Sequence, residues 1–576
     1  MINNNNKSKK THFEKGEIKN SYKLENGIYF CPLSGCEEIG KNFNMFGVVK
    51  DGQEQWILVD VGTSVERNSF GLNQHMANFE FAMQKNIIGV VCTHGHDDHI
   101  GALQFVVPRL CEKLQRDIPV YATRFTMELI YHKFNEWNEK ANFQIVKAGD
   151  IFSIGDFEIE MIYITHSIPE PNLIKITSKT YNYKIIHTGD WKFDSDPIVG
   201  EVTNENKLRS IGKQGVDLLL CDSTNACEKE ATLPEGYVKK NLDKVIKGNG
   251  GRRIIISCFS SNVARIKIIS DLARKYNRRI VVFGRSLLRM LEVAKKTGHL
   301  ESSFEYMTVE NMNNVDFKKT IVICTGSQGE KGSTLYRLAY GFKPPFPVKE
   351  GDLIIFSARK IPGNEKEINR MQSLFIRRKA EIFIAGPDCD IHVSGHPGQP
   401  EVNHMIDLLE PKAFIPVHGD AFRFKEMLSM ALAKNITRSL MPYNGAVIDL
   451  IHMKIIHSAE SGTFAMDGKR LINLESNILK TRENMAINGA VFISIDKHKI
   501  LVNHYGITEG QDSLTFITKL KEIIFHTLSN NQNIEYKEVI NNIRQNVVGY
   551  IVEKYGKYSL VSTHLMYNNF KNTETV

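Results

Sequence analysis

The stretch CTHGHDDHIGAL occupies residues 92–103 and carries three histidines and two aspartates within six positions. It follows the apolar run IIGVVC at 87–92, which has the composition of a buried strand, and it precedes a segment with helical periodicity. The polar cluster is therefore expected in a tight turn at the carboxyl end of a strand. The alternative is a polar loop whose histidines bond backbone groups, but so many ligand-type side chains in one turn favour metal binding.

The spacing within this turn predicts two neighbouring metal sites. Side chains at i and i+2 of an extended segment share a face, so His94 and His96 can bind one cation together. Asp98 and His99 point elsewhere and would serve a second cation. Two ions about 3.5 to 4 Å apart are the usual arrangement for clamping a phosphoryl group.

Three more ligand-type residues follow predicted strands further along the chain. His166 comes after FEIEMIYIT, Asp190 after YKIIHTG and His418 after KAFIPV. Each alone could be a polar strand cap, but the carboxyl ends of strands in open α/β sheets line one crevice, where such residues can converge. The predicted ligands are His94, His96 and His166 for one ion and Asp98, His99 and His418 for the other, with Asp190 bridging. Imidazole and carboxylate without thiolate favour two Zn²⁺ ions, with Mn²⁺ as the next candidate.

The whole chain has the composition of an ordinary globular α/β protein. It has 576 residues, of which 42% are hydrophobic and 24% charged, and this excludes a disordered chain or a collagen-like fibre. A net charge of +8 permits an acidic partner such as nucleic acid without implying one. Short apolar runs alternate with helix-period segments, which predicts buried, largely parallel sheets. The expected strands lie at 56–60, 87–92, 157–164, 183–187, 216–221, 253–258, 279–283, 320–325, 353–358, 381–386 and 412–417.

The sequence favours a cytoplasmic location. The first 22 residues are polar and lack the apolar core of a secretory signal, so a disordered tail is expected there. The nine cysteines are scattered and form no C-x-x-C pair, which indicates a reducing compartment. No stretch approaches the roughly 18 apolar residues of a membrane span, so no membrane contact is expected.

An ordered set of further motifs accompanies the histidine-rich turn. Together they resemble ribonuclease J, a family of β-CASP nucleases in the metallo-β-lactamase superfamily, from about residue 30 to 450 and more weakly to the C-terminus. The resemblance implies an α/β fold: a metallo-β-lactamase αββα sandwich, an inserted parallel-sheet β-CASP domain and a small α+β C-terminal domain. The motifs are PLSGCEEIGKN (32–42), HTGDWKFD (187–194), LLLCDSTNA (218–226), TGSQGE (325–330), IPGNE (361–365), HVSGH (392–396) and FIPVHGD (414–420).

The separation of Asp190 from His418 is far longer than a connection between neighbouring strands requires, and an inserted domain explains it. Two helices, at 521–528 and 538–556, are expected near the end of the chain. The expected divisions are a tail at 1–22, a first metallo-β-lactamase part at 23–226, the β-CASP domain at 227–378, a second metallo-β-lactamase part at 379–452, a linker at 453–479 and a C-terminal domain at 480–576.

The resemblance also implies roles for residues outside the predicted ligand set. Asp222 and His396 match a pair that handles the proton on the departing oxygen, and with Asp98 they form the predicted catalytic set. A carboxylate beside an imidazole fixes its tautomer and raises its pKa, as an acid working near neutral pH needs. The alternative for Asp222 is a helix N-cap before Ser223 and Thr224.

Other positions are expected to contact phosphate or to support the metal-binding turn. Ser394 and His396 match the family's ligands for the phosphate next to the cleaved bond, and Asp60 matches an aspartate that supports the turn. Strand-to-helix junctions in the inserted region expose backbone N–H groups that suit anions. Basic residues at these junctions, each of which could also be a solvated surface group, are Arg265, Arg285, Arg359 and Lys360.

The function implied is a metal-dependent ribonuclease that leaves 5′-phosphate products, acting as a 5′-to-3′ exoribonuclease and an endoribonuclease in mRNA decay and rRNA maturation. Its expected partners are single-stranded RNA and further subunits, in a homodimer, a homotetramer or a hetero-oligomer with a paralogue. Ala264, Arg359 and Lys360 depart from residues common in the family, and they bear on 5′-end recognition. The alternatives are an RNA-binding partner of an active paralogue, a DNA-directed β-CASP nuclease and a small-molecule hydrolase, which the inserted domain disfavours.

Overall fold

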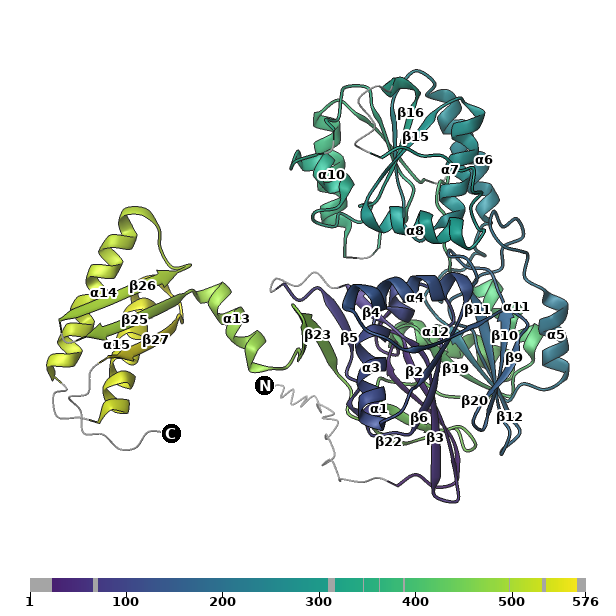
Figure 1. Ribbon diagram of the computed structural model, residues 1–576, viewed down its shortest axis with the longest axis horizontal. Helices are drawn as coiled ribbons and strands as arrows, with labels where there is room; N and C mark the ends of the chain where they lie inside the picture. The colour runs from purple at the N-terminus through teal and green to yellow at the C-terminus, as the bar shows by residue number, and fades with distance from the viewer. Residues whose placement is uncertain are drawn as a thin grey trace, which may run out of the picture. The chain divides into compact units, whose positions relative to one another are not determined.

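The computed structural model describes residues 23–65, 71–308, 316–344, 346–361, 363–386, 389–496, 498–530 and 535–566. The tail predicted at 1–22 lies outside the described residues. The chain divides into two compact units (Figure 1). One contains the residues up to Ser64 together with Met76–Gly462, and the other contains Val65–His75 together with the residues from Thr463 on.

Two β-sheets pack face to face in the larger unit. The eight-stranded sheet has the order β22-β21-β1-β2-β3-β6-β7-β8, and the seven-stranded sheet has the order β20-β19-β13-β12-β11-β10-β9. The strands of the first are β1 (Gly27–Ser34), β2 (Phe43–Lys50), β3 (Gln53–Val61), β6 (Ile87–Val91), β7 (Pro119–Thr123), β8 (Asn142–Val146), β21 (Ala446–Asp449) and β22 (Lys454–Ser458). Those of the second are β9 (Ile151–Ile154), β10 (Phe157–Tyr163), β11 (Asn172–Ser178), β12 (Tyr183–His187), β13 (Leu218–Asp222), β19 (Ala413–Val417) and β20 (Arg438–Ser439).

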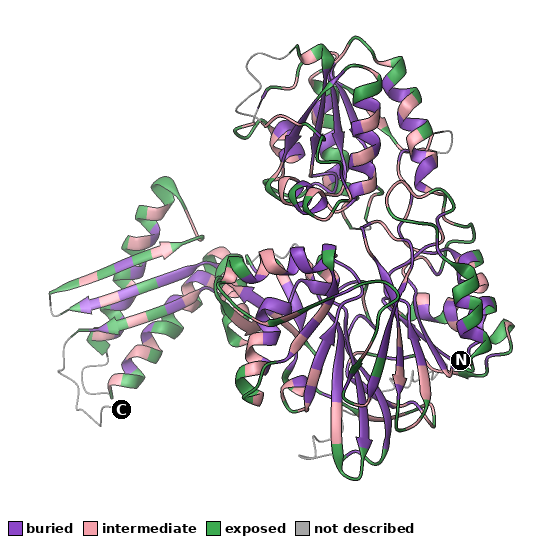
Figure 2. Ribbon diagram, turned by 45° about the vertical axis from the view of Figure 1, so that its right-hand side comes forward, coloured by how far each residue is buried: buried purple, intermediate pink, exposed green. Residues whose placement is uncertain are grey.

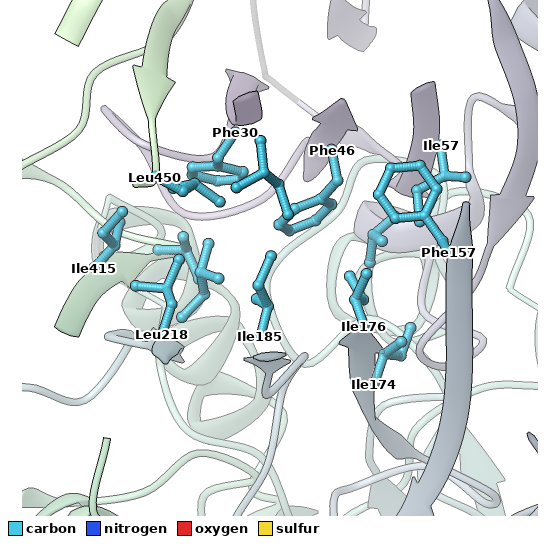
Figure 3. Close-up of a cluster of buried hydrophobic side chains, with 14 of the residues drawn as sticks. Phe30, Phe46, Ile57, Phe157, Ile174, Ile176, Ile185, Leu218, Ile415 and Leu450 are labelled. Carbon is cyan, nitrogen blue, oxygen red and sulfur yellow. The ribbon is translucent and has the colours of Figure 1, made fainter. Parts of the chain in front are cut away.

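The core of this unit lies between the two sheets. Successive strand side chains point to opposite faces, so every second residue of each sheet faces the other sheet. Phe30 and Phe46 from one sheet meet Ile176, Ile185 and Leu218 from the other, and all five are fully buried (Figure 3). Burying each such side chain contributes about 1.5 to 3 kcal/mol, so the strand ends that carry the site are held by a rigid interior.

Helices cover the outer faces of both sheets. The helices α3 (Leu103–Leu114) and α4 (Arg124–Trp137) lie on the eight-stranded sheet. On the seven-stranded sheet, α5 (Glu205–Lys213), α11 (Gln399–Leu409) and α12 (Ala421–Ala433) bury an apolar cluster that includes Trp191 and Leu219. Two one-turn helices, α1 (Glu80–Met83) and α2 (Asp97–Ile100), interrupt the connections. The layering is therefore αββα, and the predicted fold class is confirmed.

An inserted five-stranded sheet lies between β13 and β19 along the chain. Its order is β15-β16-β14-β17-β18, and every pairing is parallel. Figure 1 shows α6 and α7 on one face and α10 on the other. The strands are β14 (Ile254–Ser257), β15 (Arg279–Phe283), β16 (Thr320–Cys324), β17 (Leu353–Phe356) and β18 (Glu381–Ile384). The helices are α6 (Glu235–Gly248), α7 (Val263–Lys275), α8 (Arg285–Lys296), the short η2 (Phe317–Lys319), α9 (Thr334–Tyr340) and α10 (Glu365–Arg377).

In the smaller unit, a three-stranded sheet with the order β26-β25-β27 packs on two helices, α14 and α15. A four-stranded sheet has the order β24-β23-β5-β4. Among the described residues no helix is both long and apolar enough to cross a membrane. The elements are β4 (Thr63–Val65), β5 (Gln74–Ala77), β23 (Thr463–Asp467), β24 (Arg470–Asn473), α13 (Asn477–Asn488), β25 (Ala490–Asp496), β26 (Lys499–Tyr505), α14 (Gly510–Asn530), α15 (Tyr536–Tyr555) and β27 (Leu560–Leu565).

The predicted strands all occur, but the expectation of largely parallel sheets is correct only for the inserted sheet and for part of the sandwich. Strands β1, β2 and β3 are antiparallel, as are β9 to β12. Asp51 and Gly52 join β2 to β3 with φ of 51° and 77°, the backbone of a tight hairpin turn that pairs neighbouring strands antiparallel. The strands of the larger unit are mostly buried and its helices expose one face, whereas the strands of the C-terminal sheet are buried only in part (Figure 2).

Three element boundaries differ from the expected ones. The segment 453–479, expected as a linker, contains β22, β23 and β24, and β22 pairs with β21 in the large sheet. Strand β18 extends the inserted sheet beyond residue 378. The helix expected at 521–528 is part of the longer α14. Strands β22, β23 and β24 are only four or five residues long, so neither hydrophobic period stands out in them.

Candidate metal centre

The structure brings all the predicted ligands together at one end of the strands. The histidine-rich turn follows β6, and His96 precedes the first turn of α2. His166 follows β10, Asp190 follows β12 and His418 follows β19. Within each group, the candidate ligand atoms lie within 4.8 Å of one another; the groups are His94, His96, His166 and Asp190, then Asp98, His99, Asp190 and His418.

In the first group, three imidazole nitrogens converge. His96 Nδ1 lies 3.1 Å from His94 Nε2 and 3.1 Å from His166 Nε2. The Nδ1 of His166 lies 2.6 Å from the carbonyl oxygen of Gly395, which can only accept, so Nδ1 carries the proton and Nε2 carries a lone pair. Burial lowers the pKa of His94, His96 and His166, so all three favour the neutral form that binds metals.

The second group is rich in negative charge. His99 Nε2 lies 3.2 Å from Asp190 Oδ2 and 3.6 Å from Asp98 Oδ2, and His418 Nε2 lies 3.4 Å from Asp98 Oδ2. Burial acts to lower the pKa of His99 and His418, but the neighbouring carboxylates outweigh it and raise both. The buried carboxylates of this group therefore favour a positive charge close to them.

Both groups fit a divalent cation. Asp190 Oδ1 and His418 Nε2 are buried and make no well-aligned hydrogen bond within the described residues, although Oδ1 lies 2.9 Å from His418 Nδ1 and Nε2 lies 3.4 Å from Asp98 Oδ2. Buried polar atoms are otherwise almost always well bonded, so poorly aligned contacts of this kind suit atoms that ligate a cation. The donors are imidazoles and carboxylates, which suit zinc or manganese.

Asp60 supports the turn, as the sequence suggests. Its two oxygens accept hydrogen bonds from the Thr93 backbone N–H at 2.8 Å and the Thr93 hydroxyl at 2.7 Å. Oδ2 also lies 2.7 Å from His99 Nδ1, which leaves Nε2 to face the second group. Asp60 has φ of 61° and His418 has φ of 57°, a backbone conformation that is uncommon for non-glycine residues.

The turn also depends on a close approach of two backbones at the end of β3. Asn42 donates its backbone N–H to the carbonyl oxygen of Asp98 at 2.9 Å, and Gly62 donates to that of Asn42 at 2.8 Å. A Cβ atom at Gly62 would lie 1.7 Å from the Asp98 carbonyl oxygen. Only glycine fits at this position, so β3 fixes where Asp98 and His99 lie.

Asp222 pairs with His396 and also caps a turn at Thr224, but no helix begins there, so the helix N-cap alternative is wrong. Its Oδ2 lies 2.8 Å from His396 Nδ1, while Oδ1 accepts from the Thr224 backbone N–H at 2.9 Å and the Thr224 hydroxyl at 2.7 Å. Burial acts to raise the pKa of Asp222, but His396 outweighs it and lowers that pKa. Burial acts to lower the pKa of His396, but Asp222 and Asp190 outweigh it and raise it. The pair therefore keeps a carboxylate beside an imidazole that retains its proton.

Ser394 lies in the same loop as His396, and a residue that sequence reasoning missed holds this loop. Asn225 donates its side-chain amide to Ser394 Oγ at 2.8 Å and to the carbonyl oxygen of His396 at 3.0 Å. The Ser394 hydroxyl also accepts from the His396 backbone N–H at 3.2 Å. The signal was available, because Asn225 follows Asp222 within the same DSTNA motif.

The expectation that Arg265 contributes charge at a phosphate-binding junction is wrong. Its side chain is fully buried, and it donates to Glu235 Oε1 at 2.8 Å, to the Ser357 hydroxyl at 2.5 Å and to the carbonyl oxygen of Ile391 at 2.9 Å. The guanidinium is therefore a structural anchor inside the inserted domain.

The other basic residues at these junctions remain on the surface. Arg285 is exposed, and Arg359 pairs with Glu228 at 2.5 Å. Lys360 donates to the side chain of Asn369 at 3.0 Å. These three side chains can reorganise around a phosphate, because an exposed ion pair contributes only about 0 to 1 kcal/mol.

Comparison with known proteins identifies the family. The family model "Ribonuclease J, beta-CASP domain" matches residues 251–374, the metallo-beta-lactamase superfamily matches 42–110, and the "Zn-dependent metallo-hydrolase RNA specificity domain" matches 389–435. Ribonuclease J of Sinorhizobium meliloti is 33% identical over 475 residues, which cover 81% of this chain and 82% of that protein. The chain belongs to the ribonuclease J family.

Ribonuclease J of Helicobacter pylori strain J99 is 30% identical over 560 residues, or 93% of this chain and 79% of that protein. A crystal structure of a protein of unknown function from Enterococcus faecalis V583 has a TM-score of 0.51 at 15% identity, covering 74% of this chain and all of that one, and supports the fold alone. As a ribonuclease J family member, the protein is a hydrolase, a metal-dependent ribonuclease that binds RNA.

Proposed function

We propose that the protein hydrolyses phosphodiester bonds of single-stranded RNA with two bound divalent cations, Zn²⁺ or, as the alternative, Mn²⁺, and leaves 5′-phosphate products. The observation that carries this proposal is the convergence of two ligand groups on Asp190. When bound, a pair of such ions polarises the phosphoryl oxygens and activates a water for in-line attack. His94, His96 and His166 would hold one ion and Asp98, His99 and His418 the other, with Asp190 between them.

The chain's own residues supply the proton transfers. Asp222 holds His396 at Nδ1, so the opposite nitrogen of the ring is available to give a proton to the departing 3′ oxygen. The His396 side chain is 22% exposed while Asp222 is fully buried, so the imidazole is the member of the pair that reaches substrate. Asp98, whose side chain is 30% exposed, completes the proposed catalytic set as a carboxylate facing the same centre.

Ser394 and His396 are the proposed ligands of the phosphate next to the cleaved bond. Asn225 fixes the Ser394 hydroxyl against the loop, so the donor is preorganised. Their position beside Asp222 would place that phosphate within reach of the proton donor. This supports cleavage of one phosphodiester at a time in an extended single strand.

By kinship with the ribonuclease J family, we infer that the enzyme acts as a 5′-to-3′ exoribonuclease and as an endoribonuclease, in mRNA decay and rRNA maturation. We infer a cytoplasmic location and a homodimer or homotetramer, or a hetero-oligomer with a paralogue. The C-terminal unit is the proposed site of self-association. Ala264, Arg359 and Lys360 are proposed to modify recognition of the 5′ end.

The deciding experiment compares the wild type with a His94→Ala, His96→Ala double variant on labelled RNA, with zinc or manganese added. The double variant should lose turnover, because its first ion would keep only two of four ligands. His404→Ala is the matched control, because His404 pairs with Glu205 on the surface and should leave turnover unchanged. Undiminished cleavage by the double variant would overturn the proposal.

The same preparation separates the alternatives. RNAs with a 5′ monophosphate, with a 5′ triphosphate and without ends, given with each metal, distinguish exonuclease from endonuclease action through their product ends. A matched DNA strand tests the DNA-directed alternative. A partner subunit would bind RNA and leave it uncut.

A further inference from the structure

A loop of the inserted domain reaches the first ligand group. Ser261, between β14 and α7, places its Oγ 3.0 Å from His96 Nε2, although the two residues are 165 positions apart in the chain. The other ring nitrogen, Nδ1, is the one that faces His94 and His166. His96 is therefore held at one nitrogen by the inserted domain and faces the ligand cluster with the other.

This contact selects one tautomer of His96. A neutral imidazole has one N–H donor and one lone pair, and a ligating nitrogen needs the lone pair. Ligation through Nδ1 therefore requires the proton on Nε2, and the Ser261 oxygen is the acceptor for that N–H. The opposite tautomer would direct Nδ1–H at the nitrogens of His94 and His166, and no cation could bind there.

Other imidazoles of the centre are held from within the sandwich. Asp60 orients His99, Thr93 Oγ1 lies 3.0 Å from His94 Nδ1, and the Gly395 carbonyl orients His166. His96 differs because its partner, Ser261, belongs to the inserted domain. The position of the inserted domain therefore affects one metal ligand directly.

Ser261 is itself held firmly within its domain. The next residue, Asn262, caps α7 by accepting the Arg265 backbone N–H at 2.8 Å. The Arg265 side chain is the buried anchor that joins α7 to Glu235 and to Ser357 at the end of β17. A rigid loop of this kind costs little entropy when it makes a further hydrogen bond.

Ion pairs hold the inserted domain against the sandwich near this point. Lys296 of α8 pairs with Glu128 of α4 at 2.7 Å, and Arg289 pairs with Glu136 along the same two helices. His299 lies 3.0 Å from Glu170. These contacts join α8 to the sandwich and so help to position the inserted domain, whose loop carries Ser261, although exposed ion pairs are individually weak.

We propose that Ser261 is a positioning residue that holds His96 in the Nε2–H tautomer and ring orientation needed to bind the first ion, and so links docking of the inserted domain to metal affinity. The inference rests on the proposed two-ion centre. Loss of a partner of this kind costs about 10- to 100-fold in metal affinity. The second ligand group makes no use of His96 and should keep its affinity.

The test measures zinc affinity of the full-length protein by competition with a chromogenic chelator, and the visible spectrum of the Co²⁺-loaded form reports the geometry of the ligands. Ser261→Ala should weaken one of the two sites about tenfold or more and alter its Co²⁺ spectrum. Ser261→Thr keeps the hydroxyl and should restore most of the affinity. Ser260→Ala removes the adjacent hydroxyl and should leave metal affinity unchanged.

The affinities of the two Ser261 variants can each overturn the inference. Equal affinity of Ser261→Ala and wild type would overturn the inference, as would a loss in Ser261→Thr as large as that in Ser261→Ala. A wild-type protein that binds no zinc or cobalt would instead overturn the proposed function.

The link to docking has its own test. Lys296→Ala should also weaken the first ion, and the losses from Lys296→Ala and Ser261→Ala should not add in the double variant, because both act through His96. Full additivity would show that docking and Ser261 act separately, and would overturn the link.

Discussion

At the scale of single residues, the pairing of Asp222 with His396 gives a pH prediction. Asp222→Asn keeps the Oδ1 that accepts from Thr224 but removes the negative charge beside the imidazole. Burial then lowers the pKa of His396 with less opposition. The acid form should be lost at lower pH, so the alkaline limb of the kcat profile should move to lower pH and kcat should fall about 100-fold.

A kcat–pH profile on RNA checks this prediction. Asp407→Asn is the control, because Asp407 pairs with Lys434 on the surface at 2.6 Å and should leave the profile in place. An unchanged alkaline limb in Asp222→Asn would show that the carboxylate does not set the imidazole's proton affinity.

Arg265 gives a stability prediction at the same scale. Arg265→Met should lower the free energy of unfolding by about 3 to 5 kcal/mol, because it leaves the Glu235 carboxylate buried without its partner. Arg285→Met, at an exposed position of α8, should change it by less than about 0.5 kcal/mol. Urea unfolding measures both, and equal effects would contradict the anchoring role of Arg265.

The convergence of the candidate ligand residues could be predicted from sequence because each follows a recognisable strand or lies in the 92–103 turn. Ser261 could not be assigned in this way, because a serine has no distinctive pattern and its partner lies 165 positions away. Asn225 could have been assigned from its place in the DSTNA motif beside Asp222. Arg265 was misjudged because its position in the chain does not reveal the buried acceptors around it.

At the scale of elements, Gly62 allows the end of β3 to pack closely against the backbone at the start of α2. Gly62→Ala should displace the Asp98 carbonyl, because its Cβ would lie 1.7 Å from that oxygen. The variant should bind fewer metal ions per chain, measured by elemental analysis after desalting. Gly250→Ala is the control, because a Cβ atom at Gly250 would meet nothing within 4 Å apart from its chain neighbours. Full metal content in Gly62→Ala would contradict this coupling.

The strands of the inserted sheet, including its edge strands β15 and β18, were readable from sequence, whereas the buried hairpin of β1 and β2 and the edge strand β8 were not. The run IIIS of β14 is apolar almost throughout, but β8 reads NFQIV and has exposed and buried residues in no simple alternation. The antiparallel pairing of β2 and β3 depends on the tight turn at Asp51 and Gly52, and apolar runs carry no information about such a turn.

At the scale of the whole molecule, the metal centre joins distant parts of the chain. Its ligands come from the ends of β6, β10, β12 and β19, and a cation that binds only this assembly stabilises the folded state by mass action. At a zinc concentration about 100 times the dissociation constant, the gain should be about 2.7 kcal/mol. Thermal melts with and without chelator measure it.

The His94→Ala, His96→Ala variant is the control for this prediction and should show a smaller zinc-dependent shift in Tm. Identical melts of the wild type with and without chelator would contradict a role of the ions in holding the sandwich together. The insertion itself was predictable from the long separation of Asp190 and His418, but the docking of α8 on α4 was not, because it depends on surface charges.

Strands β13 and β19 pair directly, although the entire inserted sheet separates them along the chain. His418 follows β19, so it is synthesised after the whole inserted sheet and later than the other candidate ligands. A nascent chain therefore cannot assemble the full candidate ligand set until the inserted sheet has left the ribosome.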